Sequence, residues 1–255
     1  MENYNYINET TEIVIEDFSI ERIDSNDLST ESNTKVKDVI LLHGFNPTGF
    51  FSSNKEMMNE INQTLLRQLR GKKYRTWNIS YKTGDSFDMG AQSILNRIAK
   101  QGLSFNDCTI VAYSMGGIVA RSMISKGFHV KNLITICSPH EGIAPSFFFA
   151  PSPGPQSIMP YSEVLHQLNH NENDINNRHK YYCFGITYED FRGHHDNDTV
   201  VYLESALAKK LNGIRHRERI HLKYGTGAVG FDPHGRGKDP KFLNPVFRLC
   251  KRLFV

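Results

Sequence analysis

One serine stands where a predicted strand runs directly into a predicted helix. The segment TIVAYSMGGIVAR (109–121) opens with the apolar and β-branched residues of a buried strand and continues with residues that suit a helix. Ser114 lies at the corner, so its hydroxyl can project from the sheet as a nucleophile for acyl transfer. Such a corner crowds the positions two before and two after the serine. These positions hold the small residues Ala112 and Gly116.

The same corner predicts a place for the negative charge that acyl transfer creates. A helix that starts after Ser114 directs its N-terminal amides and the positive end of its dipole toward the serine. We therefore expect the backbone N–H of Met115 to bind the oxyanion of an attacked carbonyl. The alternative interpretation is a strand–helix turn of small residues without chemistry.

The elements around this corner alternate between strand and helix. Short apolar runs predict strands at 39–42, 75–81, 108–113, 132–137, 181–188 and 219–224. Periodic apolar residues predict helices at 53–70, 89–100, 115–126, 203–211 and 244–254. Strands joined by helices pair in parallel through right-handed crossovers. We therefore expect an α/β fold, a three-layer α/β/α sandwich with a mostly parallel central sheet, and a site at the carboxyl ends of its strands.

The domain organisation follows from length and composition. A chain of 255 residues fits one large α/β domain, here residues 36–255. Residues 1–35 are expected to form a polar N-terminal segment with an edge strand at 11–20. Residues 143–177 interrupt the alternation with three phenylalanines, then four prolines in PSPGP and IMP, and an Asn-rich stretch. This insertion predicts a cap or lid; the alternative is a long loop whose aromatic side chains fill the core.

Four segments together resemble the lipase and carboxylesterase branch of the α/β-hydrolases. They are VILLHGFN (39–46), VAYSMGG (111–117), ICSPHEG (136–142) and DNDTVVYLESA (196–206), and they occur in the order found in that family. The resemblance spans about residues 38–250. Its second segment departs from the stricter Gly-x-Ser-x-Gly pattern, because Ala112 stands at the first glycine.

The resemblance implies a triad in the chain order serine, acid, histidine. It implies Asp198 as the acid, because the family's acid comes just before a short apolar pair; Asp196 is the alternative. His234 follows the last strand and is the expected base, whereas His221 lies inside that strand. The catalytic residues are therefore predicted to be Ser114, Asp198 and His234.

The resemblance also implies the remaining parts of the site. The loop after the first parallel strand supplies a second oxyanion amide, here that of Phe45, which would act together with Met115. His43 in that loop is expected to serve packing and hydrogen bonding. In the insertion, the side chains of Phe147, Phe148, Ile158 and Met159 are expected to line an acyl pocket.

The composition excludes some other chemistries. The four cysteines form no CxxC pair, so we expect free, buried thiols. The cluster of His194, His195, Asp196 and Asp198 lacks the usual two-histidine spacing of zinc sites, so no metal and no cofactor is expected. The net charge of +3 predicts no nucleic-acid partner.

Charge and hydropathy give the expectations for location. Residues 1–34 carry nine acidic groups and one Arg, whereas 207–255 carry twelve Lys and Arg against three acids. The basic C-terminal segment FLNPVFRLCKRLFV can contact a membrane surface, or can pack on the sheet as a final helix. Neither a secretory signal nor a membrane-spanning run is seen, so a cytoplasmic location is expected.

These observations predict a serine hydrolase that cleaves carboxylic esters, with a small-molecule or lipid ester as its partner, through an acyl-enzyme intermediate. Two alternatives remain open. One is a thioesterase or acyltransferase acting on acylated substrates. The other is a protein that keeps the hydrolase fold as a binding module without catalysis.

Overall fold

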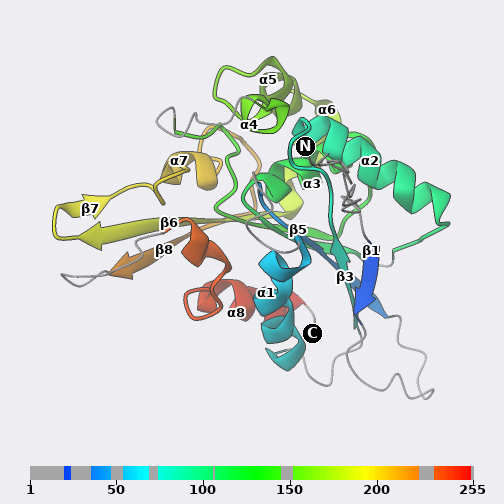
Figure 1. Cartoon of the computed structure of the whole chain (residues 1–255), viewed down its shortest axis with the longest axis horizontal. Coiled ribbons are helices and arrows are strands. Elements are labelled where there is room, and N and C mark those ends of the chain that lie inside the picture. Colours follow the sequence, from blue (N-terminus) through cyan, green and yellow to red (C-terminus); the bar gives the residue numbers. More distant parts are fainter. Residues whose placement is uncertain are drawn as a thin grey trace, which may run out of the picture.

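The strands pair into one mixed sheet (Figure 1). The computed structural model describes residues 20–23, 36–46, 54–68, 74–105, 107–144, 152–223 and 233–253. In these residues the strands are β1 (Ile20–Ile23), β2 (Lys37–Leu42), β3 (Tyr74–Ile79), β4 (Thr109–Tyr113), β5 (Asn132–Ile136), β6 (Tyr181–Asp190), β7 (Gly193–His195) and β8 (His216–Lys223). Their order across the sheet is β1-β3-β2-β4-β5-β6-β7, and β8 pairs with β6.

Parallel pairing dominates the sheet. The pairs β2–β3, β2–β4, β4–β5, β5–β6 and β6–β8 are parallel, whereas β1 and β7 pair antiparallel with β3 and β6. The prediction of a mostly parallel α/β fold is therefore confirmed. The carboxyl ends of β2, β4, β5 and β6 meet at one edge of the sheet, which brings the residues that follow these strands close together.

Both faces of the sheet are buried at its central strands, which explains why β2, β4 and β5 are mostly apolar rather than alternating. In β2, Ile40 and Leu42 pack into one core cluster, and Val39 and Leu41 pack into the other. The same division holds along β4, where Ile110 and Ala112 face the first cluster and Val111 and Tyr113 the second. These central strands therefore join two hydrophobic cores.

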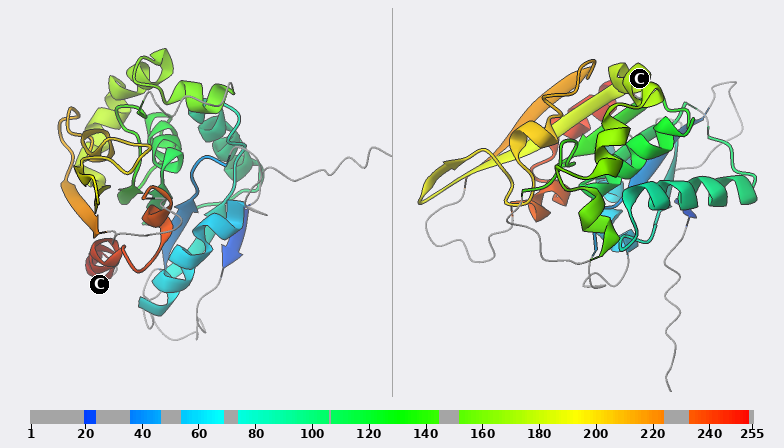
Figure 2. Two further views of the ribbon diagram at one scale, coloured as in Figure 1. Left: turned by 60° about the vertical axis from the view of Figure 1, so that its left-hand side comes forward. Right: turned by 90° about the horizontal axis from the view of Figure 1, so that it is seen from above.

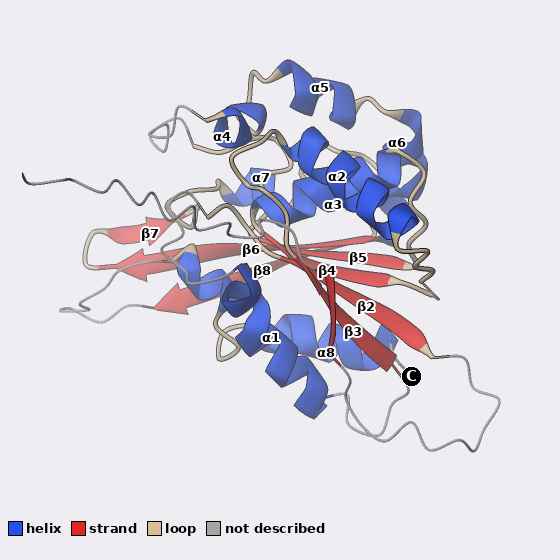
Figure 3. Ribbon diagram, turned by 45° about the vertical axis from the view of Figure 1, so that its right-hand side comes forward, coloured by secondary structure: helices blue, strands red, loops and turns tan. Residues whose placement is uncertain are grey.

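Helices cover the two faces as separate layers (Figure 3). On one face lie α1 (Asn54–Gln68) and α8 (Asn244–Leu253). On the other face lie α2 (Phe87–Lys100) and α3 (Met115–Ser125), together with α4 (Pro153–Ser157), α5 (Glu163–Asn169), α6 (Glu172–Asn177) and α7 (Leu203–Ala206). Two short 3-10 helices, Arg178–Lys180 and Gly235–Lys238, complete the described elements. The three-layer arrangement agrees with the sequence prediction.

The insertion is more ordered than a loop. Its described part, from residue 152 to 177, forms α4, α5 and α6 beside α2 and α3 (Figure 1). Short polar caps explain two of these helices, because Ser162 accepts a hydrogen bond from the Leu165 amide and Asn171 from the Asp174 amide. The predicted strand at 11–20 falls outside the described residues except for Ile20, and the edge strand that is described is β1.

One helix prediction was wrong in extent. The apolar pattern at 203–211 predicts a helix of that length, but α7 ends at Ala206. Ala208 has a φ of 51°, a left-handed conformation that a continuing α-helix cannot contain. The apolar residues beyond it, such as Leu211, are buried by the turns that follow rather than by helical periodicity.

The closing segment packs as the final helix of the domain. Val246, Phe247 and Leu249 of α8 are buried in the core cluster that α1 also enters, and Arg248 and Lys251 point to solvent. Strands β6 and β7, where the strand order of the sheet ends, project as a hairpin beyond the helical layers (Figure 2). None of the described helices combines the length and apolar character that a membrane crossing requires.

Candidate active site

The corner at Ser114 has a strained backbone. Ser114 lies between β4 and α3 with φ 51° and ψ −127°. A residue with a β-carbon adopts this conformation at a cost of about 1–3 kcal/mol. The Ser114 amide donates to the Ile136 carbonyl at 2.8 Å, which ties the corner to the end of β5. The turn directs the hydroxyl away from the sheet and toward the loops at its edge.

Two glycines leave room for this corner. A β-carbon on Gly116 would collide with the backbone carbonyls of Leu42 and His43. A β-carbon on Gly44 would lie 2.8 Å from that of Ser114. The methyl group of Ala112, in contrast, is fully buried in the core beneath α3. The steric argument from sequence therefore holds at Gly116, and Ala112 is accommodated without a glycine.

The structure brings Ser114, His234 and Asp198 into one hydrogen-bonded series. His234 Nδ1 lies 2.8 Å from Asp198 Oδ2, and His234 Nε2 lies 2.9 Å from Ser114 Oγ. An ionised carboxylate only accepts hydrogen bonds, so Nδ1 carries the proton and donates to Asp198. The Nε2 lone pair is then left to accept from the serine hydroxyl. The side chain of His234 is 14% exposed and that of Asp198 only 1%.

The carboxylate of Asp198 is held by the turn that follows it. Its Oδ1 accepts from the amides of Val200 and Val201 at 3.0 and 2.7 Å, which leaves Oδ2 for the imidazole. The alternative acid, Asp196, has a side chain that is 69% exposed and bonds to His194 instead. Of the two acids considered from sequence, Asp198 is the one in contact with His234.

The loop that carries His234 is seated on the ends of two strands. The hydroxyl of Tyr113, the residue before the nucleophile, donates to the His234 carbonyl at 2.8 Å. Gly237 packs so closely that a β-carbon there would lie 2.9 Å from the Tyr113 ring and 2.8 Å from Cys137 Sγ. Sequence reasoning did not identify Tyr113, although an aromatic hydroxyl beside a nucleophile was visible in the motif. The alternative base, His221, contacts Thr187 and Glu189 on the projecting strands.

The loop after β2 is fixed by a buried, neutral histidine. Burial lowers the pKa of His43 to about 4. Its Nδ1–H donates to the Gly44 carbonyl at 2.7 Å, and its Nε2 accepts from the Tyr81 amide at 3.2 Å. Tyr81 also donates from its hydroxyl to the His43 carbonyl at 2.9 Å. These bonds agree with the predicted packing role of His43, and they hold the backbone at Phe45 beside the corner.

The two predicted oxyanion donors come from two separate segments. Met115 is the first residue of α3, so no carbonyl within the helix can accept its N–H. Phe45 follows Gly44, where an added β-carbon would lie 2.8 Å from that of Ser114. The side chain of Phe45 is partly buried against the core cluster of α2 and α3.

The four residues predicted to bind substrate are not seen to form a pocket in the described part of the chain. Phe147 and Phe148 lie outside the described residues. Ile158 and Met159 are 4% and 2% exposed and pack in the core cluster beneath the insertion. The Ile158 carbonyl accepts from the Ile143 amide, which joins the start of the insertion to its middle. The role of these four residues in substrate binding stays a prediction.

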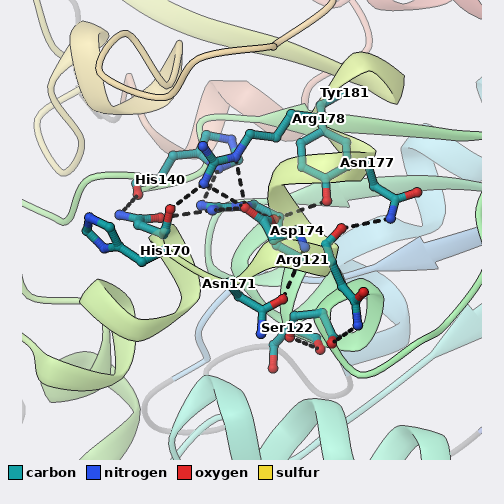
Figure 4. A network of polar contacts seen from close by, with 12 residues as sticks. Arg121, Ser122, His140, His170, Asn171, Asp174, Asn177, Arg178 and Tyr181 are labelled. Carbon is teal, nitrogen blue, oxygen red and sulfur yellow. Dashed lines mark hydrogen bonds and ion pairs between the residues drawn. The ribbon is translucent and has the colours of Figure 1, made fainter.

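A cluster of buried charged side chains joins α3, the helix that follows Ser114, to the insertion (Figure 4). Arg121 of α3 is fully buried and donates to both carboxylate oxygens of Asp174 at 2.9 and 2.8 Å. Arg178 donates to the same carboxylate at 2.9 Å, and the Tyr181 hydroxyl at 3.1 Å. The sequence alone did not reveal this cluster, because its members are up to sixty residues apart and carry no motif.

His140, from the segment that resembles a lipase loop, completes the cluster. Its Nε2 lies 2.9 Å from Thr135 Oγ1, and its carbonyl accepts from Asn169 of the insertion. Burial, together with the nearby charges of Arg121 and Arg178, lowers the pKa of His140 well below its ordinary value. A neutral His140 therefore links β5, α3 and the insertion.

Potential metal ligands are few in the part of the chain that is described. The histidines and aspartates at 194–198 do not converge on one point, because His195 bonds to Asp190 and Asp198 bonds to His234. Cys137, Asp198 and His234 are the one described group of three whose ligand atoms all lie within 4.8 Å of one another. Two of these three are already engaged with each other at the serine.

The sequence of the chain matches one known family. The family model of palmitoyl protein thioesterase matches residues 38–190, which is more than half of the chain and includes the serine corner. No curated protein matches the chain.

Solved structures share the fold. The mature form of the Bacillus licheniformis lipase BlEst2 aligns over 93% of this chain and 98% of its own, with 15% identity and a TM-score of 0.55. A thermostable esterase aligns over 94% and 64%, with 16% identity and a TM-score of 0.52. These structures share the α/β-hydrolase fold with this chain. Because the family model matches residues 38–190, the chain belongs to the palmitoyl protein thioesterase family.

Proposed function

We propose that this chain hydrolyses acyl esters and acyl thioesters through a triad of Ser114, His234 and Asp198. The observation that carries the proposal is the unbroken series of contacts from Asp198 Oδ2 through the imidazole to Ser114 Oγ, at 2.8 and 2.9 Å. These are the distances at which a general base can take a proton from a nucleophile. Membership of a hydrolase family and the strained backbone at Ser114 support the same conclusion.

The reaction takes place in two halves. Ser114 Oγ attacks the carbonyl carbon while its proton passes to His234 Nε2. The tetrahedral intermediate collapses, the leaving alcohol or thiol takes that proton, and an acyl-serine remains. A water molecule then attacks the acyl group and gives one proton to His234. His234 returns this proton to Ser114 Oγ as the bond between Oγ and the acyl carbon breaks, which releases the carboxylic acid and the free serine. Asp198 keeps its charge throughout and stabilises the imidazolium formed in each half.

The amides of Phe45 and Met115 are the proposed oxyanion donors. They flank the serine from the loop after β2 and from the first turn of α3. Each such donor typically contributes about 2.7–4 kcal/mol to transition-state stabilisation. The rigid bonding of His43 supports this role, because a donor held in place needs no reorganisation as charge develops.

The family description favours thioesters of long acyl chains on proteins as one substrate class. The lipase among the structural neighbours favours oxygen esters as the other. The two classes differ in the leaving group. A thiol has a much lower pKa than an alcohol, so a thiolate leaves with less help from a proton. Variants that weaken proton donation by His234 should therefore reduce ester cleavage more than thioester cleavage.

The first experiment tests the nucleophile. A fluorophosphonate probe should label the wild-type chain, and Ser114→Ala should lose both the label and the hydrolysis of p-nitrophenyl esters. Ser104→Ala, which changes an exposed serine in a loop after α2, is the matched control and should behave as wild type. Activity of Ser114→Ala equal to that of the control would refute the proposed function.

The second experiment separates the substrate classes. Esters and thioesters with the same acyl group, from acetyl to palmitoyl, are compared by kcat/KM with the wild-type chain. A rise toward palmitoyl on the thioester series alone supports the protein-thioester class, whereas a rise on both series supports a lipase-like range. A fall with chain length on both would contradict a long acyl pocket.

A further inference from the structure

Two histidines form a pair on the exposed side of the insertion. His166 and His170 are four residues apart at α5, so their side chains lie on the same face of the helix. Their ring centroids are 4.2 Å apart and the rings are tilted by 32°. Both residues are exposed, and neither contacts Ser114, His234 or Asp198.

A backbone hydrogen bond fixes the proton of His170. Its Nδ1 lies 2.8 Å from the His166 carbonyl, which can only accept, so the neutral ring carries its proton on Nδ1. The Nε2 atom therefore keeps its lone pair and points away from the helix backbone. Histidines that bind metals commonly donate their other ring N–H to a backbone carbonyl in this way, because the bond fixes the tautomer and the ring orientation.

The pair opens on a polar hollow. The hollow has a volume of about 570 Å³ and is lined by His166, Gln167, His170, Asn171, Glu172 and Asn173. Glu172 is the first residue of α6 and supplies the one carboxylate of this lining. Two imidazoles that face one hollow are nitrogen donors for a borderline divalent cation.

We propose that His166 and His170 form a binding site for a divalent transition-metal ion such as Zn²⁺ or Ni²⁺, with water completing the coordination. Two histidines spaced i, i+4 on a helix can reach one ion together. Imidazole nitrogens select Zn²⁺, Ni²⁺ and Cu²⁺ over Mg²⁺ and Ca²⁺, which prefer oxygen ligands. The site lies outside the triad, and the proposal does not depend on the proposed function.

The position of the pair predicts an effect on stability. His166 lies in α5 and His170 caps its C-terminal end, next to Asn169 and Asp174, which bond to the buried Arg121 of α3. An ion that joins the two rings would hold the last turn of α5 in its folded conformation. Because the two rings come together only when this turn is folded, the ion would bind the native state and raise the temperature of unfolding.

The experiment uses the full chain without a histidine tag. Zn²⁺ at about 100 times its Kd should raise Tm by about 5–10 °C, and equilibrium dialysis should find one ion per chain. Mg²⁺ should have no effect. His166→Ala and His166→Gln should both lose the shift, and the second variant keeps a polar side chain at the exposed position. The copper complex of the wild type should show two nitrogen ligands in its electron paramagnetic resonance spectrum.

The controls decide where the ion binds. His179→Ala removes another exposed histidine of the same region and should retain the full shift. Cys137→Ser tests the one group of three potential ligands in the described residues and should also retain it. The proposal is overturned if His166→Ala and His166→Gln bind Zn²⁺ like the wild type, if Cys137→Ser alone loses the ion, or if millimolar Zn²⁺ leaves the wild-type Tm unchanged.

Discussion

The buried carboxylate of Asp174 offers a sharp test of the interactions that hold the insertion to the domain. Asp174 is fully buried and accepts four hydrogen bonds, two from Arg121, one from Arg178 and one from the Tyr181 hydroxyl. Asp174→Asn keeps the shape of the side chain and removes its charge. Two guanidinium groups, one of them wholly buried, then face each other without a counter-ion.

The expected loss is large because burial prevents water from replacing the lost partner. Removing one partner of a buried ion pair typically costs about 3–5 kcal/mol. An exposed ion pair, in contrast, contributes about 0–1 kcal/mol. For a domain of this size, each kcal/mol shifts Tm by about 2–4 °C, so Asp174→Asn should lower Tm by about 6–20 °C.

The assay is urea unfolding followed by circular dichroism, with Asp107→Asn as the matched control. Asp107 pairs with Lys131 at 3.9 Å, and both side chains are about half exposed. The control should lose less than about 1 kcal/mol. Adding Arg178→Met to Asp174→Asn should restore part of the loss, because it removes one of the two uncompensated charges.

One result would refute this reasoning. If Asp174→Asn and Asp107→Asn lower the free energy of unfolding equally, the charge of Asp174 does not hold the insertion. A further loss on adding Arg178→Met would mean that the Arg178 side chain acts through packing rather than through charge.

Two further predictions concern the triad and the loop after β2. Asp198→Asn should lower kcat by about 10⁴-fold, because an amide in place of the carboxylate favours the wrong tautomer of His234, and Asp196→Asn should leave kcat near the wild-type value. Steady-state ester kinetics check both variants, and the opposite ranking would assign the acid to Asp196. His43 predicts a pH dependence of stability. Its pKa is lowered by burial to about 4 in the folded chain, so the unfolded state takes up the proton first as pH falls below about 6.5. The contribution of a neutral His43 to the free energy of unfolding is therefore fully present above that pH. About 2 kcal/mol of it is lost between pH 7 and pH 5. Urea unfolding measures the free energy of unfolding at pH 7 and at pH 5. The loss between the two should be about 2 kcal/mol smaller in His43→Gln than in the wild type, and equal losses would exclude His43 as the source.

Local sequence signals were sufficient for the strands and main helices of the sheet. Buried parallel strands are continuous apolar runs, so segments such as 39–42 and 132–137 are visible without any partner. The helix at 203–211 was overextended because apolar spacing does not record the left-handed backbone at Ala208. The short helices of the insertion were missed, since they are stabilised by single caps and by tertiary packing rather than by periodicity.

The candidate site was partly predictable for a similar reason. Ser114 and Gly116 are two positions apart in sequence, so their steric relation could be derived from the motif itself. The choice of Asp198 and His234 rested on chain order, and the structure brings both to the serine. The contact between Tyr113 and the His234 carbonyl joins residues 121 positions apart, and no local pattern encodes it. The cluster of Arg121 and Asp174 is non-local in the same way.

The backbone at position 114 separates what folding favours from what chemistry requires. Glycine occupies positive φ without steric penalty, so a glycine there would relieve about 1–3 kcal/mol. Under the proposed function, the chain keeps this strain because a glycine would remove the hydroxyl. Asp107, Cys137, Thr199 and Ala208 also have positive φ, so the strain at Ser114 points to chemistry only together with the contact between its Oγ and His234.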